Sequence, residues 1–115
     1  MDFRTYQMLA RRTQNPVLTP DEKLAHALCG LASEIGEIMS MHQHQIQDGR
    51  RLDRKELAKE IGDVEWFIAE LCDCYNMQMD AIAFENIEKL KRRYPDGFDE
   101  ERSIHRHDYD TNADA

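Results

Sequence analysis

TPDEKLAHALCGLASEIGEIMSMHQHQIQ, residues 19–47, has the pattern of one long amphipathic helix. Thr19 is suited to cap it, Pro20 to the first helical position, and Glu22 completes a capping box with Thr19. The apolar residues recur every three or four positions, at Leu24, Leu28, Leu31, Ile35 and Ile38. Asp48-Gly49 breaks the pattern, so we predict that the helix ends just before it.

Three further helices are predicted from apolar periodicity, capping residues and helix breakers. Asp53 and Glu56 form a second capping box at the start of one helix. We expect Asp80 to cap the last helix, which Pro95 stops. The expected segments are residues 3–13, 53–75 and 80–94. Because no window alternates like a strand, the sequence predicts an all-α fold, an antiparallel bundle of about four helices.

The chain has the size of one small domain. Its 115 residues are 41% hydrophobic, which allows a modest core, and oligomerisation would add buried surface. We expect a helical domain over residues 1–98. Beyond it, residues 99–115 are polar and nearly free of apolar side chains, so we expect a mobile C-terminal tail.

Charge and hydropathy exclude several kinds of partner. The formal net charge of -8 disfavours binding to a nucleic-acid polymer, although bound cations would still allow an anionic substrate. The N-terminus is polar and no apolar run approaches the roughly 18 residues of a membrane span, so we expect neither a signal peptide nor a membrane partner. The spacing of Cys29, Cys72 and Cys74 fits no metal site. We therefore expect reduced thiols and a cytoplasmic location.

Two short motifs place pairs of carboxylates inside otherwise apolar helices. EIGEI, residues 34–38, contains Glu34 and Glu37, and EIGDV, residues 60–64, contains Glu60 and Asp63. Each pair is three residues apart, so its members are neighbours on the helix surface, and both pairs lie on the same flank of their apolar stripes. In an antiparallel hairpin these flanks meet. We therefore expect four carboxylates to converge at one site that suits Mg²⁺, or Mn²⁺ in its place.

The motifs allow other interpretations. One pair by itself is more typical of a solvated acidic surface, and two pairs on matching flanks make that interpretation and a metal site about equally favoured. A di-iron bundle needs Glu-x-x-His, which the sequence lacks, and His42 and His44 are two apart and point away from each other, which disfavours zinc. Gly36 and Gly62 lie on the flank opposite the acids, where we expect a neighbouring helix to approach closely.

The chain resembles the MazG-like members of the all-α nucleoside triphosphate pyrophosphohydrolases. The resemblance rests on E-x-x-E, 22 intervening residues and then E-x-x-D, together with NIEKLKRRYPDGF at residues 86–98. It covers most of the chain, from about Thr5 to Phe98. In one place the chain departs from the family: Ser33 stands where the family often has a further glutamate. If that glutamate positions water, activity would be weaker here or the role would move.

The resemblance implies an obligate oligomer, a homodimer or homotetramer, that pools helices between subunits. It implies Mg²⁺-dependent cleavage of nucleoside triphosphates between the α and β phosphates, to a nucleoside monophosphate and pyrophosphate, in the cleaning of the nucleotide pool. By position, the metal ligands would be Glu34, Glu37, Glu60 and Asp63. The triphosphate would contact Asn86, Lys89 and Arg93.

The residues themselves fit this chemistry. Metal ions at the four acids would activate a bound water, and Glu34 or Glu37 would act as the general base. Lys89 and Arg93 share a helix face and would offset charge on the leaving pyrophosphate, although a basic last turn also suits the helix dipole.

Two residues beside the acids are candidates for contact with a nucleobase. Phe67 follows Asp63 by one turn and could stack on a base, although packing in the core is the more common role of such a residue. Gly30 precedes Glu34 by one turn and could leave room for a base. The alternative to an enzyme is a non-catalytic acidic helical bundle that kept the fold and binds a basic partner. Such a protein would not respond to Mg²⁺.

Overall fold

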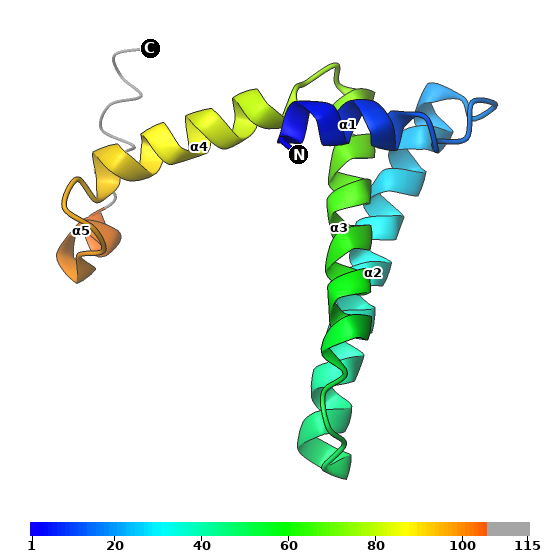
Figure 1. Ribbon diagram of the computed structural model, residues 1–115. Helices are drawn as coiled ribbons and strands as arrows, with labels where there is room; N and C mark the ends of the chain where they lie inside the picture. The colour runs from blue at the N-terminus through cyan, green and yellow to red at the C-terminus, as the bar shows by residue number, and fades with distance from the viewer. Residues whose placement is uncertain (106–115) are drawn as a thin grey trace. The chain divides into compact units, whose positions relative to one another are not determined.

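A computed structural model describes residues 1–105, in which helices are joined by turns and short loops (Figure 1). Its helices are α1 (Phe3–Arg11), α2 (Pro20–Asp48), α3 (Arg54–Cys74), α4 (Met79–Arg93) and α5 (Glu100–His105). No strand occurs in residues 1–105, so the all-α prediction is confirmed, and each of the four expected helices is present. No helix in this range combines the length and apolar character that a bilayer crossing requires.

The chain divides into two compact units. The first comprises Met1–Met79, with α1, α2 and α3, and the second begins at Asp80 and holds the rest of α4 and α5. Helix α5 occupies the start of the segment expected to be a mobile polar tail, so the tail begins with a helix that the sequence analysis did not predict. Residues 106–115 of that tail lie outside the described residues.

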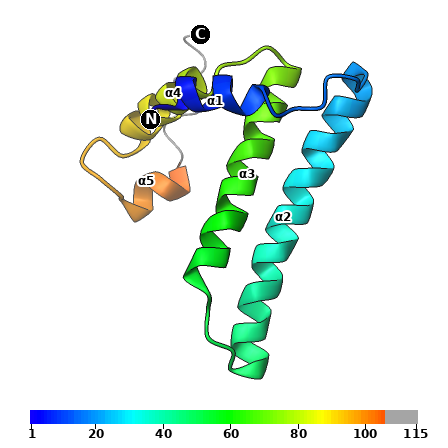
Figure 2. The same ribbon diagram turned by 45° about the vertical axis from the view of Figure 1, so that its right-hand side comes forward.

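The first unit is built on a hairpin of α2 and α3. The two helices lie side by side along most of their length, as Figures 1 and 2 both show. Gly49, in the left-handed conformation at φ 64°, ends α2, and a short loop leads to Asp53 at the start of α3. Helix α1 packs against α3 near the other end of the hairpin. The antiparallel arrangement expected of residues 20–74 is therefore present.

The helix starts follow the sequence closely, with two differences. The Thr19–Glu22 capping box is complete, since each side chain accepts a hydrogen bond from the other residue's backbone N–H. Asp53 accepts from the N–H groups of Lys55 and Glu56, but the Glu56 carboxylate pairs with Lys59, so the second box is only half formed.

The prediction that Asp80 caps α4 is wrong. The helix begins one residue earlier, and Asp80 lies in its first turn, where it accepts a hydrogen bond from the N–H of Ala81. The Gln7 side chain takes the capping role instead, because its Oε1 accepts from the N–H of Met79 at 2.9 Å. A partner 72 residues away in the sequence lies beyond any local capping pattern.

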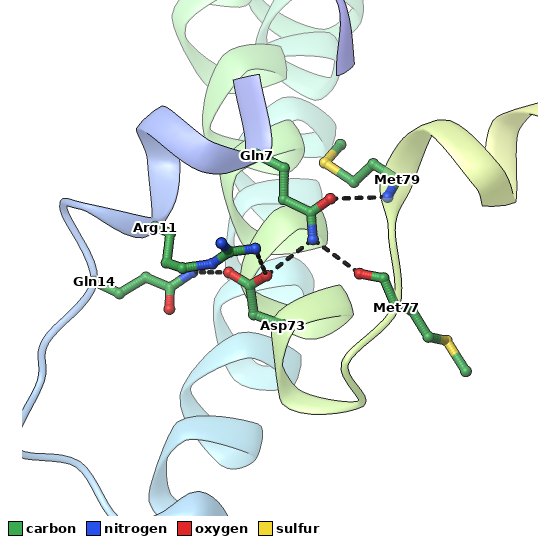
Figure 3. Close-up of polar contacts among 6 residues, drawn as sticks. All are labelled: Gln7, Arg11, Gln14, Asp73, Met77 and Met79. Atoms are coloured by element: carbon green, nitrogen blue, oxygen red, sulfur yellow. Dashed lines mark hydrogen bonds and ion pairs between the residues drawn. The ribbon is translucent and has the colours of Figure 1, made fainter. Parts of the chain in front are cut away.

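A partly buried polar network joins α1 to α3 and to the start of α4 (Figure 3). Gln7 is 1% exposed, and its Nε2 donates to Asp73 and to the carbonyl of Met77, each at 2.9 Å. Arg11 and Gln14 also donate to the Asp73 carboxylate, at 2.8 and 2.7 Å. We call Gln7, Arg11, Gln14 and Asp73 the α1–α3 joint. It fixes the turn through which the chain leaves α3.

The core of the first unit is small. Its main buried apolar cluster consists of Ala10, Ala69, Cys72 and Met79, with Tyr6 and Trp66 packed against it, and Ala27 on α2 is also buried. Many large apolar side chains stay exposed, including Leu28, Ile35, Met39 and Ile46 on α2. The close approach expected at Gly36 and Gly62 is absent within the described chain, since an added Cβ at either would meet nothing within 4 Å.

Candidate active site

Three carboxylates from the two helices of the hairpin converge on one point. Oxygens of Glu34 on α2 and of Glu60 and Asp63 on α3 lie within 4.8 Å of one another. We call these residues the acid cluster. Glu34 and Glu60 are partly buried and Asp63 is exposed, so the cluster lies at the surface of the hairpin. The predicted convergence of the two motifs is therefore found for three of the four acids.

The crowding of negative charge shifts the pKa of Glu34. A hydrogen bond with Glu60 and partial burial raise the pKa of Glu34 to about 7. The charges of Glu60, Asp63 and Glu37 contribute to the same shift. Carboxylates held this close repel each other unless a proton or a cation lies between them.

The donor set of the acid cluster fits a hard divalent cation. It offers only carboxylate oxygens, the ligands that Mg²⁺ and Mn²⁺ prefer, and the oxygens are near enough to share one ion. Neither histidine nor cysteine takes part, which is unlike a zinc site. The cluster can therefore hold a Mg²⁺ or Mn²⁺ ion and, through it, phosphate oxygens.

Glu37 lies one turn after Glu34 and is not part of the cluster. It lines a neighbouring pocket, which we call the loop pocket, together with Glu60 and the α2–α3 loop. Glu60 thus belongs to both features. The residues of the loop pocket are Glu37, Met41, His44, Arg50, Arg51, Leu52, Asp53, Glu56 and Glu60.

Arg50 and Arg51 are residues that the sequence analysis missed. They follow the helix-breaking Asp48-Gly49 and lie between the two acidic motifs in the sequence. Two adjacent arginines in this loop were a usable signal for a phosphate contact, because the loop joins the two helices that carry the acidic motifs. Their position in the same pocket as Glu37 and Glu60 needed the structure.

An aromatic group lies on the other side of the acid cluster. The Phe67 ring packs directly over Gly30, and an added Cβ at Gly30 would clash with that ring. Trp66 meets Phe67 edge-on, with centroids 5.1 Å apart, and donates a 2.7 Å hydrogen bond to Thr13. The space that we expected Gly30 to leave for a base is therefore filled by Phe67 itself.

Beneath the aromatic group lies a buried carboxyl. Glu70 is fully buried, and its Oε1 is 2.5 Å from Nδ1 of His26, whose ring is 5.4 Å from that of Phe67. The second oxygen of Glu70 has no hydrogen-bond partner among the described residues. This pair was also missed, since His26 and Glu70 are 44 residues apart and neither belongs to a motif.

The comparisons with known proteins agree with this geometry. A family model, the MazG nucleotide pyrophosphohydrolase domain, matches residues 23–98. The chain belongs to this family. The protein named Gene 37 protein, from Mycobacterium phage L5, is 29% identical over 76 residues, which cover 63% of this chain and 67% of that protein. No solved structure matches the chain.

The MazG domain match includes every residue that the sequence analysis proposed for the site. It starts within α2 and ends at Phe98, so α1 and α5 lie outside it. Membership places the chain among nucleotide pyrophosphohydrolase domains, which agrees with an acidic site suited to divalent metal. The match assigns no role to single residues, so those roles are argued from the geometry of the acid cluster and its neighbours.

The three residues predicted to contact the triphosphate, Asn86, Lys89 and Arg93, lie on α4. Asn86 is exposed, whereas Lys89 and Arg93 are partly buried in the second unit. The Arg93 guanidinium lies over the ring of Tyr94, 5.7 Å from its centroid. All three side chains belong to one continuous helix, and their contact with phosphate remains a prediction.

Proposed function

We propose that the chain is a Mg²⁺-dependent nucleoside triphosphate pyrophosphohydrolase. It cleaves ribo- or deoxyribonucleoside triphosphates between the α and β phosphates and releases a nucleoside monophosphate and pyrophosphate. Such a reaction would serve to clean the nucleotide pool. The observation that carries the proposal is the acid cluster, three carboxylates from two helices with oxygens within 4.8 Å of one another, in a chain of the MazG family.

Glu34, Glu37, Glu60 and Asp63 would hold the metal. Glu37 lies outside the acid cluster but borders it through Glu60, so it would complete the ligand set or bind the attacking water. Mg²⁺, or Mn²⁺ in its place, would neutralise phosphate oxygens and lower the pKa of a bound water.

The carboxylates also supply the base. Water attacks the α-phosphorus, and Glu37 or Glu34 takes its proton. The new bond joins the water oxygen to the α-phosphorus, and the bond from that phosphorus to the α–β bridging oxygen breaks. The bridging oxygen leaves with the pyrophosphate, which therefore carries the additional negative charge.

The remaining substrate contacts are assigned by residue chemistry. Asn86, Lys89 and Arg93 would bind phosphate oxygens, because they offer an amide and two cations on one helix. A nucleobase would stack on the part of the Phe67 ring that does not lie against Gly30. Gly30 then serves the base indirectly, by letting the ring lie close to α2.

The proposal includes a homo-oligomer, a dimer or tetramer, in the cytoplasm. The small core and the exposed apolar side chains of α2 and α3 support a second copy, because a stable domain of this length normally buries more apolar surface. The free thiols Cys29, Cys72 and Cys74 favour a reducing compartment. No contact with a membrane or a nucleic-acid polymer is proposed.

The proposal is tested by incubating the purified protein with the eight common nucleoside and deoxynucleoside triphosphates and Mg²⁺. Separated products should be monophosphate and pyrophosphate, and the rates rank the bases. Diphosphate with orthophosphate would place cleavage at the wrong bond. If no nucleotide is cleaved and Mg²⁺ with a nonhydrolysable triphosphate does not raise the melting temperature, the acidic interaction protein is the better explanation.

Charge-neutral variants test the assignment of residues. Glu37→Gln and Asp63→Asn should keep the fold and lose nearly all turnover, since each removes charge while preserving shape. Glu65→Gln is the matched control, because Glu65 is an exposed carboxylate on α3, as Asp63 is, and lies outside the acid cluster. Full activity in both site variants would contradict the assignment.

A further inference from the structure

The loop pocket combines the two kinds of charge that a metal-bound polyphosphate requires. Glu37 and Glu60 lie on its helix side, and Arg50 and Arg51 come from the loop. All of these residues belong to the first unit, so their neighbourhood depends only on the α2–α3 hairpin. A bare anion would be repelled by the carboxylates, and a bare cation would be repelled by the arginines. A polyphosphate that brings its own Mg²⁺ satisfies both.

The guanidinium groups of Arg50 and Arg51 make few contacts within residues 1–105. Arg50 is 70% exposed, and its Nε is 4.0 Å from Asp48, the outer limit of an ion pair. Arg51 has no hydrogen bond or ion pair within residues 1–105. Both guanidinium groups therefore keep their donors for a ligand. The planar guanidinium binds two phosphate oxygens at once, which suits a terminal phosphate better than a lone charge does.

The features of the site follow one another along the hairpin. Phe67 lies one turn from Asp63 on the side away from the loop, the acid cluster comes next, and Glu37 lies one turn, about 5 Å, nearer the loop than Glu34. The arginines come last, in the loop itself. A base at Phe67 and an α-phosphate at the acid cluster would leave the loop pocket for the outer phosphates.

We propose that Arg50 and Arg51 bind the β and γ phosphates, so that the triphosphate points toward the α2–α3 loop. This inference rests on the proposed function and adds the direction of the substrate in the site. The arginines hold the group that becomes pyrophosphate. As the α-phosphorus bond breaks, the charge gained by the bridging oxygen is offset by their guanidinium groups.

The test compares Arg50→Ala, Arg51→Ala and the double variant with Arg54→Ala. Arg54 is exposed at the start of α3 and does not line the loop pocket, so it is a matched control for the loss of one positive charge. Inhibition by pyrophosphate and by the monophosphate product is measured for each variant with Mg²⁺. Calorimetry of Mg²⁺-pyrophosphate binding gives a readout that needs no turnover.

The double variant should bind pyrophosphate about tenfold or more weakly and raise KM for the triphosphate, since charge-assisted hydrogen bonds are lost. Inhibition by the monophosphate and Mn²⁺ binding without nucleotide should stay within about twofold, because the acid cluster is intact. Arg54→Ala should resemble the wild type throughout. The double variant Arg50→Lys with Arg51→Lys should bind pyrophosphate more tightly than the double alanine variant but more weakly than the wild type. Lysine restores the positive charge but lacks the planar guanidinium that binds two phosphate oxygens.

Three results would overturn the inference, and they are distinguishable. If the wild type forms monophosphate and pyrophosphate but the double variant binds pyrophosphate as the wild type does, the arginines do not hold the outer phosphates and the proposed function stands. Equal losses for monophosphate and pyrophosphate would show that the loop acts on the whole site instead. If the wild type releases no pyrophosphate, the function and the inference fail together.

Discussion

Gly30 is the glycine at which this hairpin uses the absence of a side chain. The Phe67 ring occupies the position that a Cβ would take, whereas the positions beside Gly36 and Gly62 are open. A mid-helix glycine costs about 1 kcal/mol relative to alanine. At Gly30 this cost is offset by close packing of an aromatic ring against α2.

Gly30→Ala should therefore destabilise the protein by about 1–3 kcal/mol, because the new methyl displaces Phe67. Gly36→Ala, in the same helix, should instead stabilise it by about 0.5–1 kcal/mol through helix propensity. Urea unfolding of both variants measures the difference. A destabilised Gly36→Ala would reveal a neighbour, such as a second copy, that approaches this position in the assembly.

For single residues, the sequence predicted which acids share a helix flank better than it predicted where each side chain lies. Glu34, Glu60 and Asp63 could be predicted because helical periodicity fixes their flank, and they do converge. Glu37 has the same flank but its carboxylate lies outside the cluster, since side-chain direction is not set by the helical angle alone. The fate of Gly30 was missed, because which residue fills a gap depends on packing across the two helices.

At the scale of elements, the α1–α3 joint decides how α3 ends and α4 begins. Asp73 receives hydrogen bonds from Gln7, Arg11 and Gln14 (Figure 3). Partial burial by itself would raise the pKa of Asp73, but these three donors outweigh it, and the pKa lies below its usual value. The carboxylate therefore stabilises the folded state in its ionised form.

The sign of the pH dependence follows from that lowered pKa. Stabilisation by Asp73 is complete above the unfolded-state pKa of about 3.9 and is lost as the pH falls through the folded-state value. At pH 7, Asp73→Asn should lower the free energy of unfolding by about 1–3 kcal/mol. The deficit should shrink toward pH 3. Urea unfolding at both values checks this.

Asp21→Asn is a suitable control for the pH experiment, because Asp21 is an exposed carboxylate in the first turn of α2. It should change stability by less than about 1 kcal/mol. If the deficit of Asp73→Asn is the same at pH 3 and pH 7, the ionised carboxylate does not hold the joint.

The elements were largely predictable because local signals define them. Thr19 with Glu22, Gly49 and Asp53 mark the limits of α2 and α3 in the sequence, and the structure uses all of them. The start of α4 was misplaced because its cap is Gln7, a residue of another helix. Helix α5 was missed because its six residues lie in a polar segment that has no apolar periodicity.

At the scale of the whole molecule, α2 carries an apolar face that the described chain does not cover. An open groove near its C-terminal end is lined by Ile38, Met39, His42, Gln43, Ile46 and Gln47. Met39 and Ile46 are 66% and 69% exposed. The sequence predicted a small core and hence oligomerisation, but it could not show which face remains open, because an apolar stripe looks the same whether it packs within the chain or against the proposed second copy.

Light scattering of the wild type should give at least two chains per particle. Met39→Glu with Ile46→Glu should shift the protein toward the monomer, because two charges would have to be buried. Val17→Glu adds a charge at an even more exposed apolar residue outside α2 and should leave the mass unchanged. A wild type that is monomeric at micromolar concentration would exclude the proposed assembly.

If the proposed mechanism holds, water attacks the α-phosphorus of a nucleoside triphosphate at the acid cluster. Turnover with Mg²⁺ in water enriched in oxygen-18, followed by mass spectrometry of both products, shows which phosphorus is attacked. We expect one heavy oxygen in the nucleoside monophosphate and none in the pyrophosphate. Heavy oxygen in the pyrophosphate would place the attack on the β-phosphorus and contradict the mechanism.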